Sequence, residues 1–222
     1  MSVQSPNIIN IVFTAIISII PILVLFIVLR LKYPIIIRVN QRDKRKDGND
    51  VALFAASFNP IHKGHVAILR RIAMRHSKVF CVIGFNPNKT YPVSPEERKR
   101  LAEKAVEADS KLKGKVEVVM VRGYIWKFAT RNNVNIMYRG IRTWEKDGEE
   151  ESRLHFQNLL GPMLLGPCVL PPETRFVESE PKYIDISSSK IRSAVKNGIS
   201  IEQYVPDVIL KDVNSLWKTK KS

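Results

Sequence analysis

The segment Ala55–His65, with the sequence AASFNPIHKGH, constrains the fold of this chain most. It follows a short apolar run, Val51–Phe54, and precedes an amphipathic stretch, Val66–Ala73, which predicts a strand, a tight loop and a helix. His62 and His65 are three residues apart, so the first helical turn would place them on one side. Free N–H groups at a helix start bind anions, and two imidazoles beside them suit a phosphate. The alternative is an ordinary loop with two surface histidines.

Apolar strand-like runs alternate with helical patterns, which predicts an α/β fold with a Rossmann-like, doubly wound parallel sheet. The expected strands are Val51–Ala55, Val79–Gly84, Val116–Val121, Ile136–Tyr138 and Cys168–Leu170, and the expected helices are Gly64–Arg75, Pro95–Ala108, Ile125–Asn132, Glu149–Leu159 and Ser188–Asn197. Ligands bind such sheets at the carboxyl ends of strands, where the first loop lies. The fingerprints GxGxxG and GxxxxGK[ST] are both absent, which argues against dehydrogenases and P-loop proteins.

No charged residue lies between Ile8 and Leu29, and the run is long enough to cross the roughly 30 Å core of a bilayer as a helix. We expect one N-terminal transmembrane helix through residues 8–29. A cleaved signal peptide fits less well because residues 1–7 carry no charged side chain, and a buried core helix fits less well because the run has no polar face.

Basic residues follow this run, so the positive-inside rule predicts a single-pass membrane protein whose remaining chain faces the cytosol. They are Arg30, Lys32, Arg38, Arg42, Lys44, Arg45 and Lys46. The expected organisation is an anchor with a short tail at residues 1–32, a basic juxtamembrane linker at 33–50, and a soluble domain at 51–222.

The formal net charge of +15 favours anionic partners, and the juxtamembrane run and the lysines near the C-terminus contribute part of it. Aromatic residues make up only 8% of the chain and form no evident stacking platform, so we expect no nucleic-acid partner. Cys81 and Cys168 have no metal-ligand spacing with other Cys or His residues, which predicts buried, inert thiols and no protein-bound metal site.

Three further groups carry anion-binding chemistry. Lys89 follows the second expected strand, Arg139 and Arg142 follow the fourth, and the triple-serine run Ser187–Ser189 opens the last long helix. Each has an ordinary alternative: a solvated lysine, a charged loop, and simple N-capping. Because the ends of parallel strands meet at one edge, we expect these groups to converge with the histidines on one phosphate-binding crevice.

The first loop, Ser57–His65, resembles the motif of the HxGH nucleotidyltransferases. From Val51 to Leu210 the chain is similar to bacterial-type phosphopantetheine adenylyltransferases, on these residues: Pro87–Lys89, Ser94–Arg98, Arg139–Arg142, Asp147, Glu151, Asn158 and Ile186–Ser189. The opening Ser-Phe-Asn-Pro-Ile is also similar to nicotinamide mononucleotide adenylyltransferases, because the phosphopantetheine family commonly has Asp where Asn59 stands and Thr where His62 stands.

The resemblance implies an enzyme that transfers AMP from ATP, with Mg²⁺, to 4'-phosphopantetheine, releasing pyrophosphate and giving dephospho-CoA in coenzyme A biosynthesis. The same chemistry on nicotinamide or nicotinate mononucleotide, use of CTP, and a non-catalytic nucleotide-binding membrane scaffold are the alternatives. The phosphopantetheine family also suggests a homo-oligomer.

The resemblance assigns roles to the following residues. The catalytic residues would be His65, His62 and Lys89. ATP would contact Ser57, Phe58, His65, Gly140, Ile141, Arg142, Glu151, Tyr183, Ile184, Asp185, Ile186, Ser187, Ser188 and Ser189. The acceptor would contact Ser57, Lys89, Tyr124 and Arg139.

Overall fold

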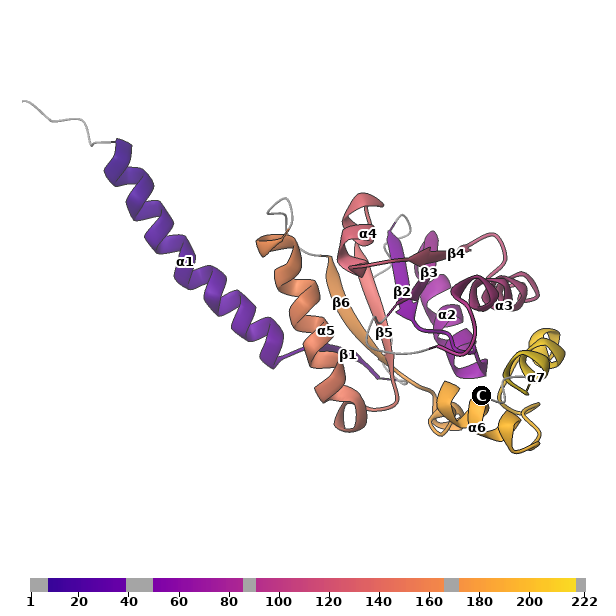
Figure 1. The fold of residues 1–222 in the computed structure, drawn as a ribbon. Helices are drawn as coiled ribbons and strands as arrows, with labels where there is room; N and C mark the ends of the chain where they lie inside the picture. Colours follow the sequence, from indigo (N-terminus) through magenta and orange to yellow (C-terminus); the bar gives the residue numbers. More distant parts are fainter. Residues whose placement is uncertain (1–7, 39–49, 86–90, 166–171, 219–222) are drawn as a thin grey trace, which may run out of the picture. The chain divides into compact units, whose positions relative to one another are not determined.

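The computed structural model describes residues 8–38, 50–85, 91–165 and 172–218. The chain divides into two compact units, residues 1–34 and residues 35–222. Figure 1 shows the helix of the first unit and the sheet with its helices in the second.

The first unit is one helix, α1 (Ile8–Lys32), which contains Pro21. Most of its described apolar side chains are exposed, and the stretch Ile11–Arg30 has a mean hydropathy of 3.1, so it is long and apolar enough to cross a membrane. Arg30 and Lys32 lie in the last turn, where cations complement the negative end of the helix dipole. The predicted N-terminal apolar helix is therefore present as a candidate membrane span.

The second unit is built on a parallel sheet whose described strands number six, in the order β1-β6-β5-β2-β3-β4. The strands are β1 (Ile35–Ile37), β2 (Val51–Ala56), β3 (Lys78–Gly84), β4 (Val116–Val121), β5 (Ile136–Ile141) and β6 (Glu173–Glu178). Its helices are α2 (Lys63–Ala73), α3 (Pro95–Glu107), α4 (Ile125–Arg131), α5 (Trp144–Leu164), α6 (Ser188–Lys196) and α7 (Leu210–Lys218), with 3₁₀ turns at Pro181–Tyr183 and Asp207–Ile209. The predicted Rossmann-like fold is confirmed.

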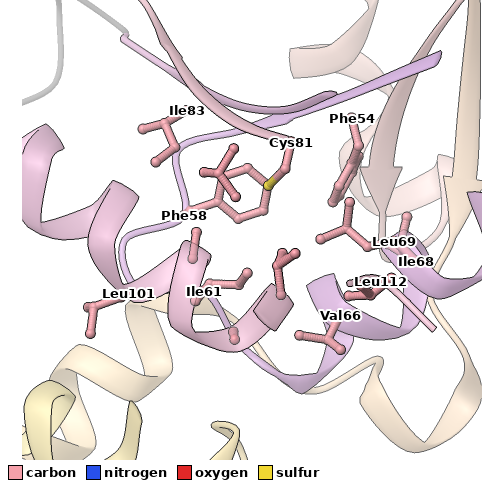
Figure 2. Close-up of a cluster of buried hydrophobic side chains, with 14 of the residues drawn as sticks. Phe54, Phe58, Ile61, Val66, Ile68, Leu69, Cys81, Ile83, Leu101 and Leu112 are labelled. Atoms are coloured by element: carbon pink, nitrogen blue, oxygen red, sulfur yellow. The ribbon is translucent and has the colours of Figure 1, made fainter. Parts of the chain in front are cut away.

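Helices cover both faces of the sheet, which explains why the central strand β2 is apolar at successive positions. Ala52 and Phe54 face the larger core with residues of α2, α3, α6 and α7, while Leu53 and Ala55 face a smaller core with residues of α4. Figure 2 shows part of the larger core, in which Phe58 and Ile61 from the loop after β2 pack among strand and helix side chains. These two side chains, both 0% exposed, hold the loop to the core.

Several elements differ from the expectation. Residues 35–37, assigned to the linker from the sequence, form β1 and pair with β6 in parallel, and strand β6 and helix α7 were not predicted. The expected strand Cys168–Leu170 lies outside the described residues. Helix α5 starts earlier than expected because Thr143 caps it, its hydroxyl accepting from the Lys146 N–H at 3.3 Å.

Candidate active site

The loop between β2 and α2 lies where the strand order reverses. β2 pairs with β3 on one side and with β5 on the other, so the next strands in the chain continue to opposite edges of the sheet. Such a switch point opens a crevice at the carboxyl ends of the strands, which is the usual ligand site of this architecture. Within the loop, Phe58 adopts a φ of 44°, an unusual conformation for a residue other than glycine, while its ring is fully buried.

The two histidines form a single stacked unit at the start of α2. His62 is the N-cap, and its Nδ1 accepts a hydrogen bond from the His65 N–H at 3.3 Å. The two rings stack with centroids 3.6 Å apart. A Cβ at Gly64 would lie 3.1 Å from His62 Nδ1 and 3.4 Å from the Tyr183 Cβ, so any larger residue would require the His62 ring to shift by a few tenths of an ångström. The glycine therefore leaves space for the His62 ring in its stacked position.

Burial keeps both imidazoles neutral. Desolvation lowers the pKa of His62 to about 3, and burial together with the neighbouring His62 lowers the pKa of His65 well below its usual value. Because His62 Nδ1 accepts a hydrogen bond, the proton of this neutral ring is on Nε2. Neither ring therefore carries a positive charge at neutral pH, and the His62 Nε2–H is a hydrogen-bond donor.

The serine segment lies against the histidine loop, as predicted. Ser187 caps α6 by accepting from the Lys190 N–H, and Ser188 Oγ donates to the Pro60 carbonyl at 2.9 Å. Arg192 donates to the Asn59 carbonyl at 2.8 Å and to Ser189 Oγ at 2.9 Å. These bonds join the start of α6 directly to the loop after β2.

The segment Tyr183–Ile186 leads into α6 and lies beside the same loop through the contact between Tyr183 and Gly64 described above. Ile186 is buried in the larger core, Ile184 is partly buried, and Asp185 is exposed. The segment thus lies beside the loop after β2, and the buried Ile186 side chain anchors it.

Arg139 and Arg142 both lie at the end of β5, but neither guanidinium is free. Arg139 forms a two-pronged ion pair with Glu151, with both N–O distances at 2.8 Å, and donates to the Ala55 carbonyl at 2.9 Å. Arg142 pairs with Asp147 through its side chain and its backbone N–H. This arrangement differs from the expected pair of guanidiniums open to phosphate.

Gly140 and Ile141 lie between these two arginines in the sequence and pack against neighbouring side chains. A Cβ at Gly140 would lie 2.9 Å from the Ile68 side chain of α2, and Ile141 is buried. Arg139 itself is placed beside the end of β2 by the parallel pairing of β5 with β2.

Tyr124 lies at the start of α4, 40% exposed, and stacks on Trp126 with ring centroids 5.7 Å apart. A Cβ at Gly84 would lie 3.7 Å from the Ile125 side chain and 3.9 Å from the Ala56 carbonyl. The first turn of α4 is therefore beside the carboxyl ends of β2 and β3, close to Ser57. The other expected acceptor-binding residue, Lys89, lies outside the described residues.

Arg98 was not predicted as part of the site. Its side chain is fully buried, donates to the Ser57 carbonyl at 2.7 Å, and packs over the Tyr91 ring at 4.3 Å. The sequence contains a signal for it. The buried stripe of α3 is Arg98, Leu101, Ala102 and Ala105, so an arginine occupies the first position of a core-facing helical pattern.

The described residues contain no group of three or more His, Cys, Asp or Glu side chains arranged to hold a metal ion. Cys81 is buried and burial raises the pKa of its thiol, as expected for an inert cysteine. Cys168 lies outside the described part of the chain.

Residues 53–194 match the family model described as cytidylyltransferase-like, and the chain belongs to this family. It is a nucleotidyltransferase, in agreement with the HxGH motif. Within the family, it is 32% identical to the phosphopantetheine adenylyltransferase of Streptococcus pneumoniae (strain CGSP14), over 74% of this chain and 95% of the relative. It is 30% identical to the phosphopantetheine adenylyltransferase of Synechococcus sp. (strain JA-2-3B'a(2-13)), over 73% of this chain and 95% of the relative. The predicted likeness to phosphopantetheine adenylyltransferases is confirmed.

The fold is also that of a solved structure of nicotinic acid mononucleotide adenylyltransferase from Plasmodium falciparum, complexed with NaAD. The TM-score is 0.53 at 16% sequence identity, and the match covers 78% of this chain and 100% of that chain.

Proposed function

We propose that this chain transfers AMP from ATP to 4'-phosphopantetheine, giving dephospho-CoA and pyrophosphate in coenzyme A biosynthesis. The observation that carries the proposal is the 32% identity to a phosphopantetheine adenylyltransferase over nearly the whole of that relative. The joined histidine loop and serine segment support it, because they bring two helix N-termini and neutral imidazole donors together at the switch point of the sheet.

In the proposed reaction, an oxygen of the acceptor phosphate attacks the α-phosphorus of ATP, and the bond to the β-phosphate oxygen breaks as pyrophosphate leaves. No covalent enzyme intermediate is required. The protein brings two anions together and stabilises the added charge on the α-phosphate oxygens in the transition state. His65 donates a hydrogen bond to the α-phosphate, and stacking against His62 orients its ring.

The N–H groups at the start of α6, with Ser57, Phe58, Gly140–Arg142, Glu151 and the segment Tyr183–Ser189, enclose ATP in this proposal. Arg139, Lys89 and Tyr124 lie at the acceptor. Arg139 is already paired with Glu151, so it would share its guanidinium between that carboxylate and the acceptor phosphate.

Mg²⁺ is proposed to enter bound to the phosphate oxygens of ATP, where it offsets their charge.

The main alternative acceptor is nicotinamide or nicotinate mononucleotide. It is favoured by the fold shared with the Plasmodium enzyme and by Asn59 and His62 in the first loop. An acceptor screen separates the two: purified full-length protein in detergent is incubated with Mg·ATP and each acceptor, and the products are identified by mass spectrometry. We expect dephospho-CoA. A dinucleotide product with no dephospho-CoA would contradict the proposal, and His65→Ala protein prepared in the same way controls for contaminating enzymes. CTP replaces ATP in a parallel series.

We also propose that residues 1–32 anchor the enzyme in a membrane, with the catalytic unit in the cytosol. The length and hydropathy of α1 support the anchor, and the basic residues after it support the orientation. The wild-type protein should stay with membranes in alkaline carbonate, whereas Ile17→Lys/Ile20→Lys should be released. A wild-type protein extracted by carbonate would contradict the anchor, and protease protection of the catalytic unit in sealed cytosol-facing-out vesicles would contradict the orientation.

A further inference from the structure

The strands of the parallel sheet begin at a common level, at one end of the second unit. Neighbouring strand starts are aligned in the pairs Val116–Val79, Lys78–Val51, Ala52–Ile136 and Ile136–Glu173. Helices α2 to α5 end here as well, because each of them precedes a strand. This end lies opposite the crevice at the carboxyl ends of the strands. We call residues 50–51, 73–78, 107–117, 131–136, 164–165 and 172–173 the amino-end surface.

The amino-end surface carries more cations than carboxylates. Most of its carboxylates are already paired with cations, in the ion pairs Lys78–Glu117, Lys113–Glu107, Arg70–Asp109 and Arg175–Glu173. The remaining carboxylate is that of Asp50. Further cations of this surface form no ion pair in the part of the chain that the structure describes, and they are Arg75, Lys111, Lys115 and Arg131. The surface is therefore positively charged at neutral pH.

Large apolar side chains are exposed beside these cations. Met74 at the end of α2 is 66% exposed, and Leu164 and Leu165 at the end of α5 are 73% and 64% exposed. Cations near helix C-termini are expected from the helix dipole alone, but exposed apolar side chains beside them are not. Apolar side chains set among lysines and arginines are typical of surfaces that bind anionic lipid.

Helix α5 shows which end of the second unit favours an anionic partner. Its first half, which follows β5 and the carboxyl ends of the strands, contains the exposed Glu145 and Glu149. Its second half, Leu154–Leu164, contains no acidic residue and ends at the amino-end surface, with Phe156 50% exposed. Anionic lipid would repel the first half and not the second.

The chain enters the second unit close to the amino-end surface. Only Tyr33 and Pro34 separate the last residue of α1 from β1, and three Cα steps span at most about 11 Å, at whatever angle the two units meet. Ile35 pairs with Arg175, which lies about 7 Å along β6 from the start of that strand. A membrane crossed by α1 would therefore lie close to the amino-end surface.

We propose that the amino-end surface, together with the second half of α5, docks on an anionic lipid bilayer. Strand β2 has six residues and is about 20 Å long, so the crevice at its carboxyl end would open into the aqueous phase, where a nucleotide and a phosphorylated acceptor are dissolved. The proposal rests on the proposed anchor only for the distance between α1 and β1, and it does not depend on which acceptor is used.

A lysine footprint of the full-length wild-type protein tests the docking without any variant. The protein is reconstituted in vesicles of phosphatidylcholine, with or without phosphatidylserine, and acetylated with a membrane-impermeant reagent. Lys182, which follows the carboxyl end of β6 and is 65% exposed, is the internal reference. We expect the acetylation of Lys111 and Lys115 relative to Lys182 to fall about threefold or more when phosphatidylserine is present. Equal ratios in the two kinds of vesicle would overturn the proposal.

Methionine oxidation gives a second footprint that does not depend on charged reporters. Met74 lies on the amino-end surface, and Met120, 37% exposed near the carboxyl end of β4, is its internal control. Hydroxyl radicals should oxidise Met74 less in vesicles with phosphatidylserine than in those without it, while the oxidation of Met120 stays constant. Loss of reactivity at both methionines would show general shielding by the vesicle and overturn the proposed orientation.

Variants test whether the cations of this surface cause the docking. Lys111→Gln/Arg131→Gln should lose most of the protection of Met74, because both positions are exposed and positively charged. The matched control, Lys99→Gln/Lys211→Gln, removes the same charge from the first half of α3 and from α7 and should keep the protection. Full protection of Met74 in Lys111→Gln/Arg131→Gln would overturn electrostatic docking.

Two comparisons separate docking from the anchor and from self-association. If carbonate extracts the wild-type protein while Met74 is still protected on anionic vesicles, the docking is supported and only the anchor is lost. If the protein resists carbonate but Met74 reacts equally in both kinds of vesicle, the anchor stands and the docking is overturned. Protection of Met74 that rises with protein concentration in detergent would assign this surface to a second copy of the chain and overturn the proposal.

Discussion

Two halves of the candidate site differ in how their polar groups are satisfied. In the histidine–serine half, made of His62, His65 and Ser187–Ser189, neutral side chains form hydrogen bonds with neighbouring backbone groups and, at Ser189, with Arg192. In the arginine–carboxylate half, Arg139 and Arg142 are paired with Glu151 and Asp147. Among the described residues, no ion pair or hydrogen bond joins a carboxylate to this first half. In the second half, a phosphate has to share each guanidinium with a carboxylate or displace it.

The largest expected effect is in the histidine–serine half. His65→Ala should lower turnover by ~10²-fold or more, because it removes the proposed donor to the α-phosphate in the transition state. The measurement is kcat for the acceptor found in the screen, with circular dichroism to confirm the fold. Lys99→Met, at a partly exposed position of α3 that pairs with Glu103, is the control. Near-normal turnover of His65→Ala would show that the histidine–serine half is not the catalytic site.

The next largest effect concerns the arginine–carboxylate half, where the Arg139–Glu151 ion pair should contribute to stability. Arg139 and Glu151 are mostly buried, with side-chain exposures of 22% and 10%. Glu151→Met leaves a buried guanidinium unpaired, so it should lower the free energy of unfolding by about 2–3 kcal/mol, whereas Arg139→Met/Glu151→Met should cost less than the sum of the single changes. Urea unfolding of the four proteins measures the coupling. Strict additivity would show that the two side chains do not stabilise each other.

The neutral imidazoles predict a dependence of stability on pH. His62 has a folded-state pKa of about 3, so between pH 6.5 and 3 the unfolded chain binds the proton and the folded chain does not, and stability falls as pH is lowered through this window. From pH 6.5 to 5 the loss from His62 should approach about 2 kcal/mol. His62→Asn keeps an N-cap acceptor and removes this titration, so its unfolding free energy should fall less steeply. Parallel pH curves for the two proteins would contradict the burial argument.

The smallest effect concerns Arg142, whose side chain is about half exposed. Its pair with Asp147 should contribute less than ~1 kcal/mol to stability. Asp147→Asn releases the guanidinium and should lower the KM for ATP by about threefold, while Arg142→Met should raise it by a similar factor, the scale of one hydrogen bond. Steady-state kinetics with varied ATP distinguish these outcomes. If Asp147→Asn raises the KM, the carboxylate positions Arg142 and does not compete with ATP.

The loop after β2 could be predicted from the sequence because its signals are local. Apolar runs on both sides, a turn at Asn59-Pro60 and an anion-binding helix start all lie within a few residues. The convergence of His62, His65 and the serine segment followed from the rule that strand ends meet at one edge, and the hydrogen bonds from α6 to the loop agree with it.

Strand β6 could not be predicted because its stability comes from distant parts of the chain. Its sequence, Glu-Thr-Arg-Phe-Val-Glu, has neither an apolar run nor a clean alternation, yet Thr174 and Arg175 are buried between β5 and β1. Glu151 and Asp147 were recognised from the sequence as motif residues. Their ion pairs with Arg139 and Arg142 could not be predicted, because these pairs depend on how α5 packs beside β5. Arg98 was missed because a charged residue in a helix opening usually faces water.

The short strand β1 has a practical consequence for any soluble form of this enzyme. β1 covers the outer edge of β6, and Arg71 reinforces it by donating to the carbonyls of Glu178 and Arg38. A shortened chain that starts at Val51, where the sequence places the domain boundary, leaves the N–H and C=O groups of that edge bare and open to pairing with other molecules. Aggregation is the expected fate of such a chain. Truncation after α1, at Tyr33, keeps the edge closed and should give a monodisperse preparation.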